Sequence, residues 1–138
     1  MPVVVDASIA AAWCFPDEVD PAADVALDRL ATEGAVVPAL WWFEIRNILV
    51  VNERRGRVDA AETAAFLADL SGLPVRIDRE PDSEIVMALA RKHKLTAYNA
   101  AYRELARRLG AALLATLDRA LALAAAAEGI PVIGRAGS

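Results

Sequence analysis

The sequence predicts a single α/β domain built on a covered, parallel sheet. Short apolar runs alternate with longer segments of helical spacing along all 138 residues, and this order is typical of alternating strands and helices. The short runs are strongly apolar, as expected for strands buried on both faces. No Ser/Gly-rich linker or shift in composition divides the chain, so we expect one domain over residues 1–138.

The expected strands are short, several are rich in β-branched residues, and most adjoin Gly or Pro. They cover residues 2–5, 35–37, 74–76, 112–115 and 131–133. Between them, helices are expected over 21–33, 40–55, 59–70, 80–92, 97–109 and 117–128. Pro21 suits the first helical position. Asp59 and Glu62 form an approximate capping box, and Gly72 ends that helix.

Composition narrows the class of protein. Hydrophobic residues make up 57% of the chain and charged residues 25%, enough apolar side chain for a core. No apolar stretch approaches the ~20 residues that span a bilayer, and no signal-like segment opens the sequence. We therefore expect a soluble, cytoplasmic protein. The lone cysteine, Cys14, is expected to be a reduced, buried thiol, which excludes disulfide and zinc frameworks.

Charge argues against a nonspecific nucleic-acid binder. The net charge is −4 and the pI is near 5.0, whereas such binders need a broad basic surface to neutralise phosphates. An acidic protein can still act on RNA with a bound cation and a local cluster of arginines. The arginines available for a cluster are Arg46, Arg54, Arg55, Arg57, Arg103, Arg107 and Arg108. Solvated helix faces are the simpler interpretation for most of them.

Two acidic residues follow strands of the expected sheet. Asp6 comes directly after the first strand, and Asp118 lies three residues past the fourth, at the start of a helix. Ligands of open parallel sheets bind beyond the carboxyl ends of the strands, near the point where strand order reverses. Each residue has an alternative as a helix cap, because Asp is a favoured cap after a strand.

Glu44 is harder to explain as a structural residue, because it lies inside an apolar stretch between Phe43 and Ile45. A salt bridge to an arginine is the alternative, although Arg46 is too close in sequence to face it on a helix. Clustered carboxylates repel one another, so they normally hold a cation. Oxygen ligands without His or Cys favour Mg²⁺ or Mn²⁺. Such a site suits phosphodiester hydrolysis, which needs no nucleophile from the protein. The only histidine, His93, is accordingly expected on the solvated surface rather than in catalysis.

At four places the sequence resembles the PIN domain, and most closely the VapC-type ribonuclease toxins of toxin-antitoxin systems. The resemblance covers essentially the whole chain, and its motifs are strong evidence together although each is weak alone. They are Val3-Val4-Val5-Asp6-Ala7-Ser8, Glu44-Ile45-Arg46-Asn47, Leu95-Thr96-Ala97-Tyr98-Asn99-Ala100-Ala101-Tyr102 and Leu113-Leu114-Ala115-Thr116-Leu117-Asp118.

The resemblance implies that Asp6, Glu44 and Asp118 bind Mg²⁺ or Mn²⁺, directly or through water. Thr116 would orient a water or contact phosphate. Ser8 would assist or would simply cap a helix, and the cap is the role we expect. Asn47 could face the same cleft from one helical turn beyond Glu44.

Asn99 departs from the family, which usually has Asp at this fourth metal and catalytic position. The amide lacks the negative charge and cannot accept a proton, although its oxygen can still ligate a hard cation weakly. We therefore expect weakened or absent activity. Natural divergence and an engineered Asp-to-Asn substitution both explain the change, and the intact flanking motif favours the second.

The resemblance also implies a three-layer α/β/α sandwich with a central parallel sheet of four or five strands, a homodimer, an RNA substrate and a VapB-type antitoxin. The antitoxin would lie along a groove lined by helices. Candidates for that groove or for the dimer contact are Trp13, Phe15, Trp41, Trp42 and Phe43, with core packing as the alternative for at least half of them. Tyr98 and Tyr102 could stack on RNA bases, although core or partner contact is the simpler expectation.

Two other functions remain open from the sequence. A phosphoacceptor receiver domain is also α/β, but this chain lacks the acidic pair after the first strand and the late lysine that such a domain needs. A PIN-like binding module without catalysis is compatible with Asn99. The sequence does not reveal which RNA is cut, because that choice depends on surface loops and shape.

Overall fold

The computed structural model describes residues 2–15, 17, 20–110 and 113–133. Within these residues five strands form one sheet in the order β3-β2-β1-β4-β5, and every neighbouring pair is parallel. They are β1 (Val3–Val5), β2 (Ala35–Pro38), β3 (Val75–Asp78), β4 (Leu113–Ala115) and β5 (Val132–Ile133). The prediction of a parallel α/β sheet is therefore confirmed, with β1 at its centre.

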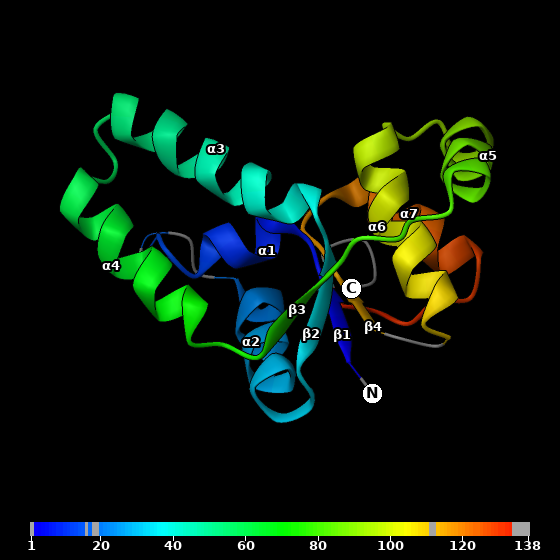
Figure 1. Cartoon of the computed structure of the whole chain (residues 1–138), viewed down its shortest axis with the longest axis horizontal. Coiled ribbons are helices and arrows are strands. Elements are labelled where there is room, and N and C mark those ends of the chain that lie inside the picture. Colours follow the sequence, from blue (N-terminus) through cyan, green and yellow to red (C-terminus); the bar gives the residue numbers. More distant parts are fainter. Residues whose placement is uncertain (1, 16, 18–19, 111–112, 134–138) are drawn as a thin grey trace.

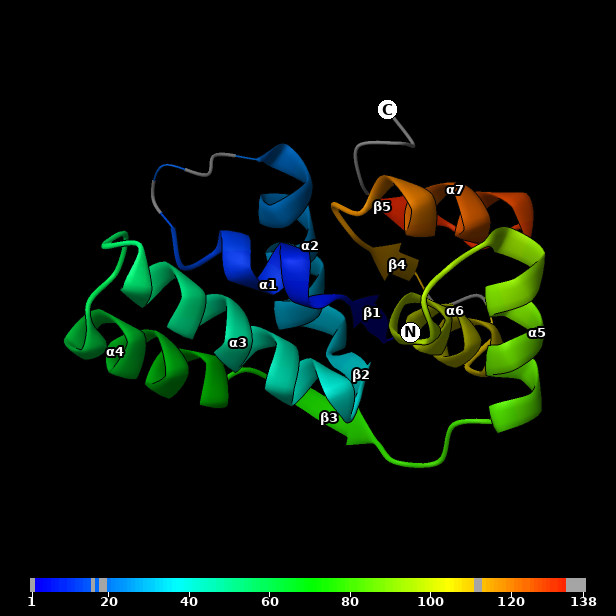
Figure 2. The same ribbon diagram turned by 90° about the horizontal axis from the view of Figure 1, so that it is seen from above.

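Helices cover both faces of the sheet and complete three layers. Figures 1 and 2 show α1 to α4 on one side of the strands and α5 to α7 on the other. The helices are α1 (Ala7–Ala12), α2 (Pro21–Glu33), α3 (Leu40–Arg54), α4 (Ala60–Ser71), α5 (Ser83–His93), α6 (Ala97–Arg108) and α7 (Arg119–Ala127). None of the described helices combines the length and apolarity that crossing a membrane requires.

The centre of the sheet explains where a site can form. Val3, Val4 and Val5 are completely buried, because helices cover β1 on both faces. β1 pairs with β2 on one side and with β4 on the other, with Val5 opposite Ala115. Strand order reverses at this β1/β4 pair, so the carboxyl ends of these two strands border the crevice where ligands of such sheets bind.

Most boundaries of the expected elements follow the predicted ones, and caps explain the shifted starts of α5 and α7. Helix α1 was not among the expected helices. α5 begins at Ser83 rather than at residue 80, because Asp82 accepts the capping hydrogen bond from the backbone N–H of Ile85. α7 begins at Arg119 rather than at residue 117 because Asp118 is its N-cap. Both side chains satisfy backbone donors that the first turn leaves free.

The predicted capping box is confirmed: Asp59 accepts from the backbone N–H of Glu62, whose side chain accepts from Asp59 N–H. β3 extends two residues further than expected, to Asp78, and residue 112 of the predicted fourth strand lies outside the described residues. The prediction for Cys14 was partly wrong, because the thiol is half-buried at the edge of the core.

Candidate active site

Asp6 and Asp118 follow the two central strands and cap the helices that leave them. Asp6 Oδ1 accepts from the backbone N–H of Ile9 at 3.2 Å and so caps α1. Asp118 Oδ1 accepts from the N–H of Leu121 at 2.9 Å and caps α7. Both residues therefore have the capping role that the sequence left open. In each of these bonds only one carboxylate oxygen is used, and the second oxygen points to a different partner.

Two hydroxyl groups tie the ends of β1 and β4 together. Ser8 Oγ donates to Asp6 Oδ1 at 2.6 Å and accepts from the backbone N–H of Leu117 at 3.0 Å. Thr116 Oγ1 donates to Asp6 Oδ2 and accepts from Asp118 N–H at 2.9 Å. The expected helix-capping role of Ser8 was wrong, because Asp6 is the cap of α1 and Ser8 lies in its first turn. Both hydroxyls hold Asp6 in one orientation.

Glu44 reaches the same crevice from α3. Its carboxylate accepts a hydrogen bond of 2.6 Å from the hydroxyl of Tyr102 on α6. The alternative of a salt bridge is not supported, because among the described residues no lysine or arginine pairs with Glu44. Arg46 instead donates to the carbonyl oxygen of Trp42 and stacks 3.6 Å above the centroid of its ring.

Tyr102 has a role at the site that sequence reasoning did not assign, although core contact was the simpler expectation for it. It is 1% exposed, so it cannot stack on an RNA base in this structure. Burial, together with the neighbouring carboxylates of Glu44 and Asp6, raises the pKa of its hydroxyl, which therefore remains a proton donor. Its spacing of three residues from Asn99 on a helix was the available signal, because such residues share a face.

The carboxylates of Asp6 and Glu44 lie close enough for the charge of one to act on the other. Burial raises the pKa of Asp6 from 3.8 to about 6; hydrogen bonds from Ser8 and Thr116 oppose this rise, while the charge of Glu44 adds to it. Burial also raises the pKa of Glu44, and the bond from Tyr102 opposes that rise. Among the described residues neither carboxylate forms an ion pair. The ionised pair is thus an unfavourable arrangement that a bound cation would relieve.

Asn99 completes the crevice from the first turn of α6. Its side-chain Nδ2 donates to Asp118 Oδ2 at 3.2 Å, while its backbone N–H is bound by the capping hydroxyl of Thr96. The fold thus forms two pairs, Asn99 with Asp118 and Glu44 with Asp6. Thr116 links the pairs because it donates to Asp6 and accepts from the backbone N–H of Asp118. Across the described ranges, no group of three or more His, Cys, Asp or Glu side chains is placed to hold a metal ion. Asn99 contributes an amide and no negative charge to this group of side chains.

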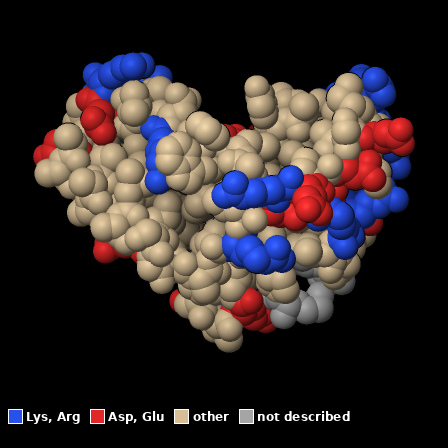
Figure 3. Space-filling model, in the orientation of Figure 1, with Lys and Arg blue, Asp and Glu red and all other residues tan. Residues whose placement is uncertain are grey.

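Three of the arginines that the sequence offered for a cluster pair with carboxylates. Arg57 pairs with Asp17, Arg103 with Glu128, and Arg108 with Asp78 and Glu104. Figure 3 shows acidic side chains beside basic ones mainly on the right of this view. Arg103 is an exception to the solvated helix faces expected for most of the arginines, since it is 1% exposed. His93 was also misplaced, because it is largely buried and its Nε2 lies 2.9 Å from Glu128 Oε1.

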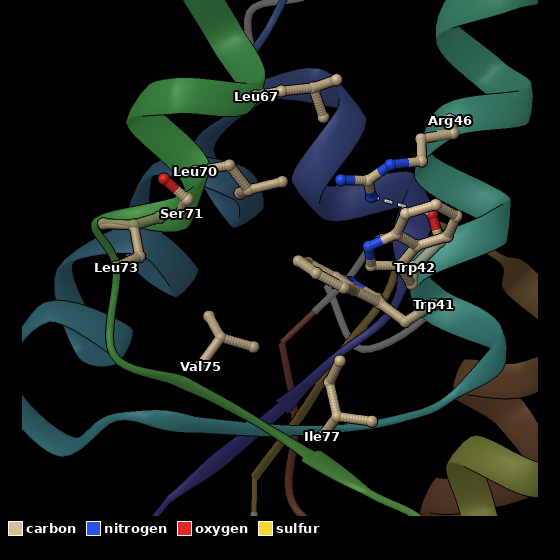
Figure 4. A pocket seen from close by; sticks show the side chains of 9 residues that line it. All are labelled: Trp41, Trp42, Arg46, Leu67, Leu70, Ser71, Leu73, Val75 and Ile77. Atoms are coloured by element: carbon tan, nitrogen blue, oxygen red, sulfur yellow. Dashed lines mark hydrogen bonds between the residues drawn. The ribbon is translucent and has the colours of Figure 1, made fainter.

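The candidate aromatic residues divide between three environments. Trp41 and Trp42 line an apolar groove of about 180 Å³ between α3 and α4, and Arg46 lies beside them at its rim (Figure 4). Trp41 is buried, and its indole Nε1 has no hydrogen-bond partner in the part of the chain that the structure describes. Phe15 is buried beneath Arg57, and Trp13 donates to the carbonyl oxygen of Ala23. Phe43 borders a separate cavity, which it shares with Glu44.

Comparison with known proteins agrees with this fold. The PIN domain family matches residues 3–127. Ribonuclease VapC3 of Pyrobaculum aerophilum is 35% identical over 125 residues, which are 88% of this chain and 93% of that protein. The crystal structure of PAE2754 from P. aerophilum has a TM-score of 0.73 and 26% identity, and the similarity covers 96% of this chain and 90% of the other. The chain therefore belongs to the PIN-domain family, among its VapC-type ribonucleases.

Proposed function

We propose that this chain is a metal-dependent endoribonuclease toxin of a type II toxin-antitoxin system that hydrolyses RNA phosphodiester bonds. The observation that carries the metal dependence is the pair Asp6 and Glu44, which are ionisable, close together and without a cationic partner among the described residues. Carboxylates in such an environment at the end of a central strand are candidates for a functional site.

The donor atoms at the crevice fit a hard divalent ion, because they are carboxylate, amide and hydroxyl oxygens without a His or Cys ligand. Asp6, Glu44 and Asp118 would hold Mg²⁺ or Mn²⁺, directly or through water, and Asn99 would contribute a weaker amide oxygen. Such an ion, when bound, supplies an activated water and stabilises the charge that builds on the phosphate oxygens.

Neighbouring residues set the geometry of these ligands. Ser8 and Thr116 hold both oxygens of Asp6, and the buried hydroxyl of Tyr102 fixes Glu44. Tyr102 is a positioning residue in this proposal, because its high pKa keeps the proton on its own oxygen. Ligands held in this way need little reorganisation when substrate and cation bind.

Asn99 weakens the proposed site in two ways. Its amide carries no charge and cannot accept a proton. Its Nδ2 also donates to Asp118 Oδ2 and so competes with a cation for that oxygen. We expect the chain with Asn99 to bind the cation weakly and to cleave RNA slowly.

Membership of the VapC-type ribonucleases implies an RNA substrate and a VapB-type antitoxin. We assign the antitoxin to the groove between α3 and α4, which is lined mainly by apolar side chains. Arg46 at its rim suits an acidic side chain of the partner, and the unpartnered Nε1 of Trp41 suits a carbonyl oxygen. We also propose that two copies of this chain form a homodimer.

A catalytically silent PIN-like module is the second candidate, and the bond from Asn99 to Asp118 is the observation that favours it. The receiver domain has no comparable support, because the chain belongs to the PIN-domain family.

The test restores the carboxylate. The chain with Asn99 and the Asn99→Asp variant are compared on total RNA and transfer RNA in Mg²⁺ or Mn²⁺ and again in EDTA. We expect metal-dependent cleavage to rise ~10²- to 10³-fold in the variant, because removing one electrostatic catalytic group typically has an effect of that size. Mn²⁺ titration by calorimetry should show tighter binding by the variant.

Asp6→Ala in the Asn99→Asp background is the blank for both measurements. Cleavage that persists in EDTA or in the blank would contradict the proposed site. Silence of both forms on RNA, combined with measurable RNA binding, would support the silent module.

A further inference from the structure

A cavity opens beside Glu44, which is a neighbour of Asp6. It has a volume of about 460 Å³ and is lined by Leu40, Phe43, Glu44, Asn47 and Tyr98, from α3 and from the first turn of α6. Glu44 belongs both to this cavity and to the acidic crevice, so an occupant of the cavity would adjoin the catalytic carboxylates. The volume lies in the range of small-ligand pockets, roughly 300–1,000 Å³.

Two aromatic side chains in this cavity are exposed without a role in the core. Phe43 is 69% exposed and Tyr98 is 63% exposed. The same helices bury other residues instead, including Trp41 and Ile45 on α3 and Tyr102 on α6. Exposed aromatic rings that gather at a cavity beside a reactive centre indicate a binding surface.

Phe43 is supported from behind by its neighbours. Its ring meets the ring of Trp42 edge to face, with centroids 4.9 Å apart and planes at 70°. The guanidinium of Arg46 in turn lies over Trp42. Such contacts hold an exposed ring in place, which lowers the entropy lost when a flat ligand stacks on it.

We propose that Phe43 and Tyr98 stack on the bases that flank the cleaved phosphodiester of a single-stranded RNA segment. This inference rests on the proposed function. Single-stranded RNA is commonly bound by stacking of unpaired bases on aromatic side chains. Asn47, which also lines the cavity, adds an amide that can pair with a base edge.

Charge selects a base rather than a phosphate as the occupant. Among the described residues, Glu44 is the one charged side chain that lines the cavity, and it would repel an anion and tolerate a neutral ring. The net charge of −4 also removes the broad phosphate attraction on which basic RNA binders depend. Stacking therefore has to supply much of the affinity for RNA. The pair also replaces Tyr98 and Tyr102, the pair suggested by the sequence, because Tyr102 is buried.

The experiment separates this inference from the nuclease assignment. Binding is measured by fluorescence anisotropy on the chain with Asn99, in EDTA. The two labelled ligands are a single-stranded RNA and an abasic oligonucleotide of the same length, which keeps the backbone but lacks the bases. We expect Phe43→Leu and Tyr98→Leu each to weaken RNA binding about tenfold. The abasic oligonucleotide should bind weakly to every form, and Tyr98→Phe should retain affinity.

Kinetics in the Asn99→Asp background give the second readout. The leucine variants should raise KM about tenfold with kcat nearly unchanged, whereas Leu123→Ala, an exposed apolar residue of α7, should leave both values as they were. Unchanged affinity and KM in the leucine variants would overturn the inference even if cleavage is strong. Equal binding of abasic and normal RNA would overturn it as well. Loss of cleavage in Asn99→Asp itself would reject the proposed function, and the binding measurement would still test the stacking.

Discussion

Carboxylates of this protein lie in two kinds of environment. On the side of α5 to α7, Asp78 and Glu104 meet Arg108, and Glu128 meets Lys92, His93 and Arg103. Arg108 lowers the pKa of Asp78, and Lys92 and His93 lower that of Glu128 to about 2. At the ends of the central strands the pKa of Asp6 is instead raised to about 6.

The difference separates structural charges from functional ones. A paired carboxylate stabilises the fold because its charged form is favoured by its partner. Asp6 and Glu44 destabilise the metal-free fold in their charged forms, and their hydrogen bonds come from neutral hydroxyl and backbone groups. Ionisable groups whose pKa values are shifted by burial are typical of functional sites, where a ligand can stabilise the charged form. Three substitutions test this contrast, in order of expected effect.

Arg108→Ala should have the largest effect on stability. It removes the partner of Glu104, which is 1% exposed, and leaves that buried carboxylate with the backbone N–H of Asp82. Removing one partner of a fully buried pair costs roughly 3–5 kcal/mol, and because Arg108 is 35% exposed we expect a loss of about 2 kcal/mol. Urea unfolding measures it, with Arg107→Ala on the same helix as the control. Equal losses in both variants would mean that the pairing is not structural.

Asp6→Asn should stabilise the metal-free protein. The rise of its pKa from 3.8 to about 6 corresponds to ~3 kcal/mol against folding at neutral pH. The amide accepts fewer hydrogen bonds than the carboxylate, so we expect a net gain of about 1–2 kcal/mol. Because the folded-state pKa is raised, this gain is complete above pH 6 and vanishes below the ordinary value of 3.8.

Thermal unfolding in EDTA at pH 7 and at pH 3.5 checks this sign. The surface variant Asp69→Asn serves as the control. A loss of stability in Asp6→Asn at pH 7 would show that the carboxylate is structurally compensated, which would remove the contrast between the two regions.

Glu128→Gln should have the smallest effect, confined to a window of pH. The folded-state pKa of Glu128 is lowered from 4.5 to about 2, so its ionised form stabilises the fold above pH 4.5. That contribution is lost as pH falls from 4.5 to 2. The variant should therefore melt below the parent at pH 6 and approach it at pH 3, with Glu80→Gln as the control. A constant difference across this range would contradict the pairing with Lys92 and His93.

The fold was largely predictable because its signals are local. The valines of β1 and the glycines and prolines that end the runs predicted the strands closely, and the Asp59 capping box predicted the start of α4. The start of α5 was missed because Asp82 competes with earlier acidic residues as the cap, and the choice depends on backbone geometry. The family match accords with the motifs around Asp6, Glu44, Asn99 and Asp118.

The sequence by itself determined the α/β order, the carboxylates at the strand ends, and the amide at Asn99. Only the tertiary structure decided their partners: Tyr102 for Glu44, Thr116 for Asp6, and Asn99 for Asp118. It also decided that Tyr102 is buried while Phe43 and Tyr98 are exposed. The physical reason is the separation along the sequence over which each kind of interaction acts. Helix and strand patterns repeat within a few residues, whereas burial and long-range hydrogen bonds join segments 19 to 110 residues apart, which only the packed layers bring together.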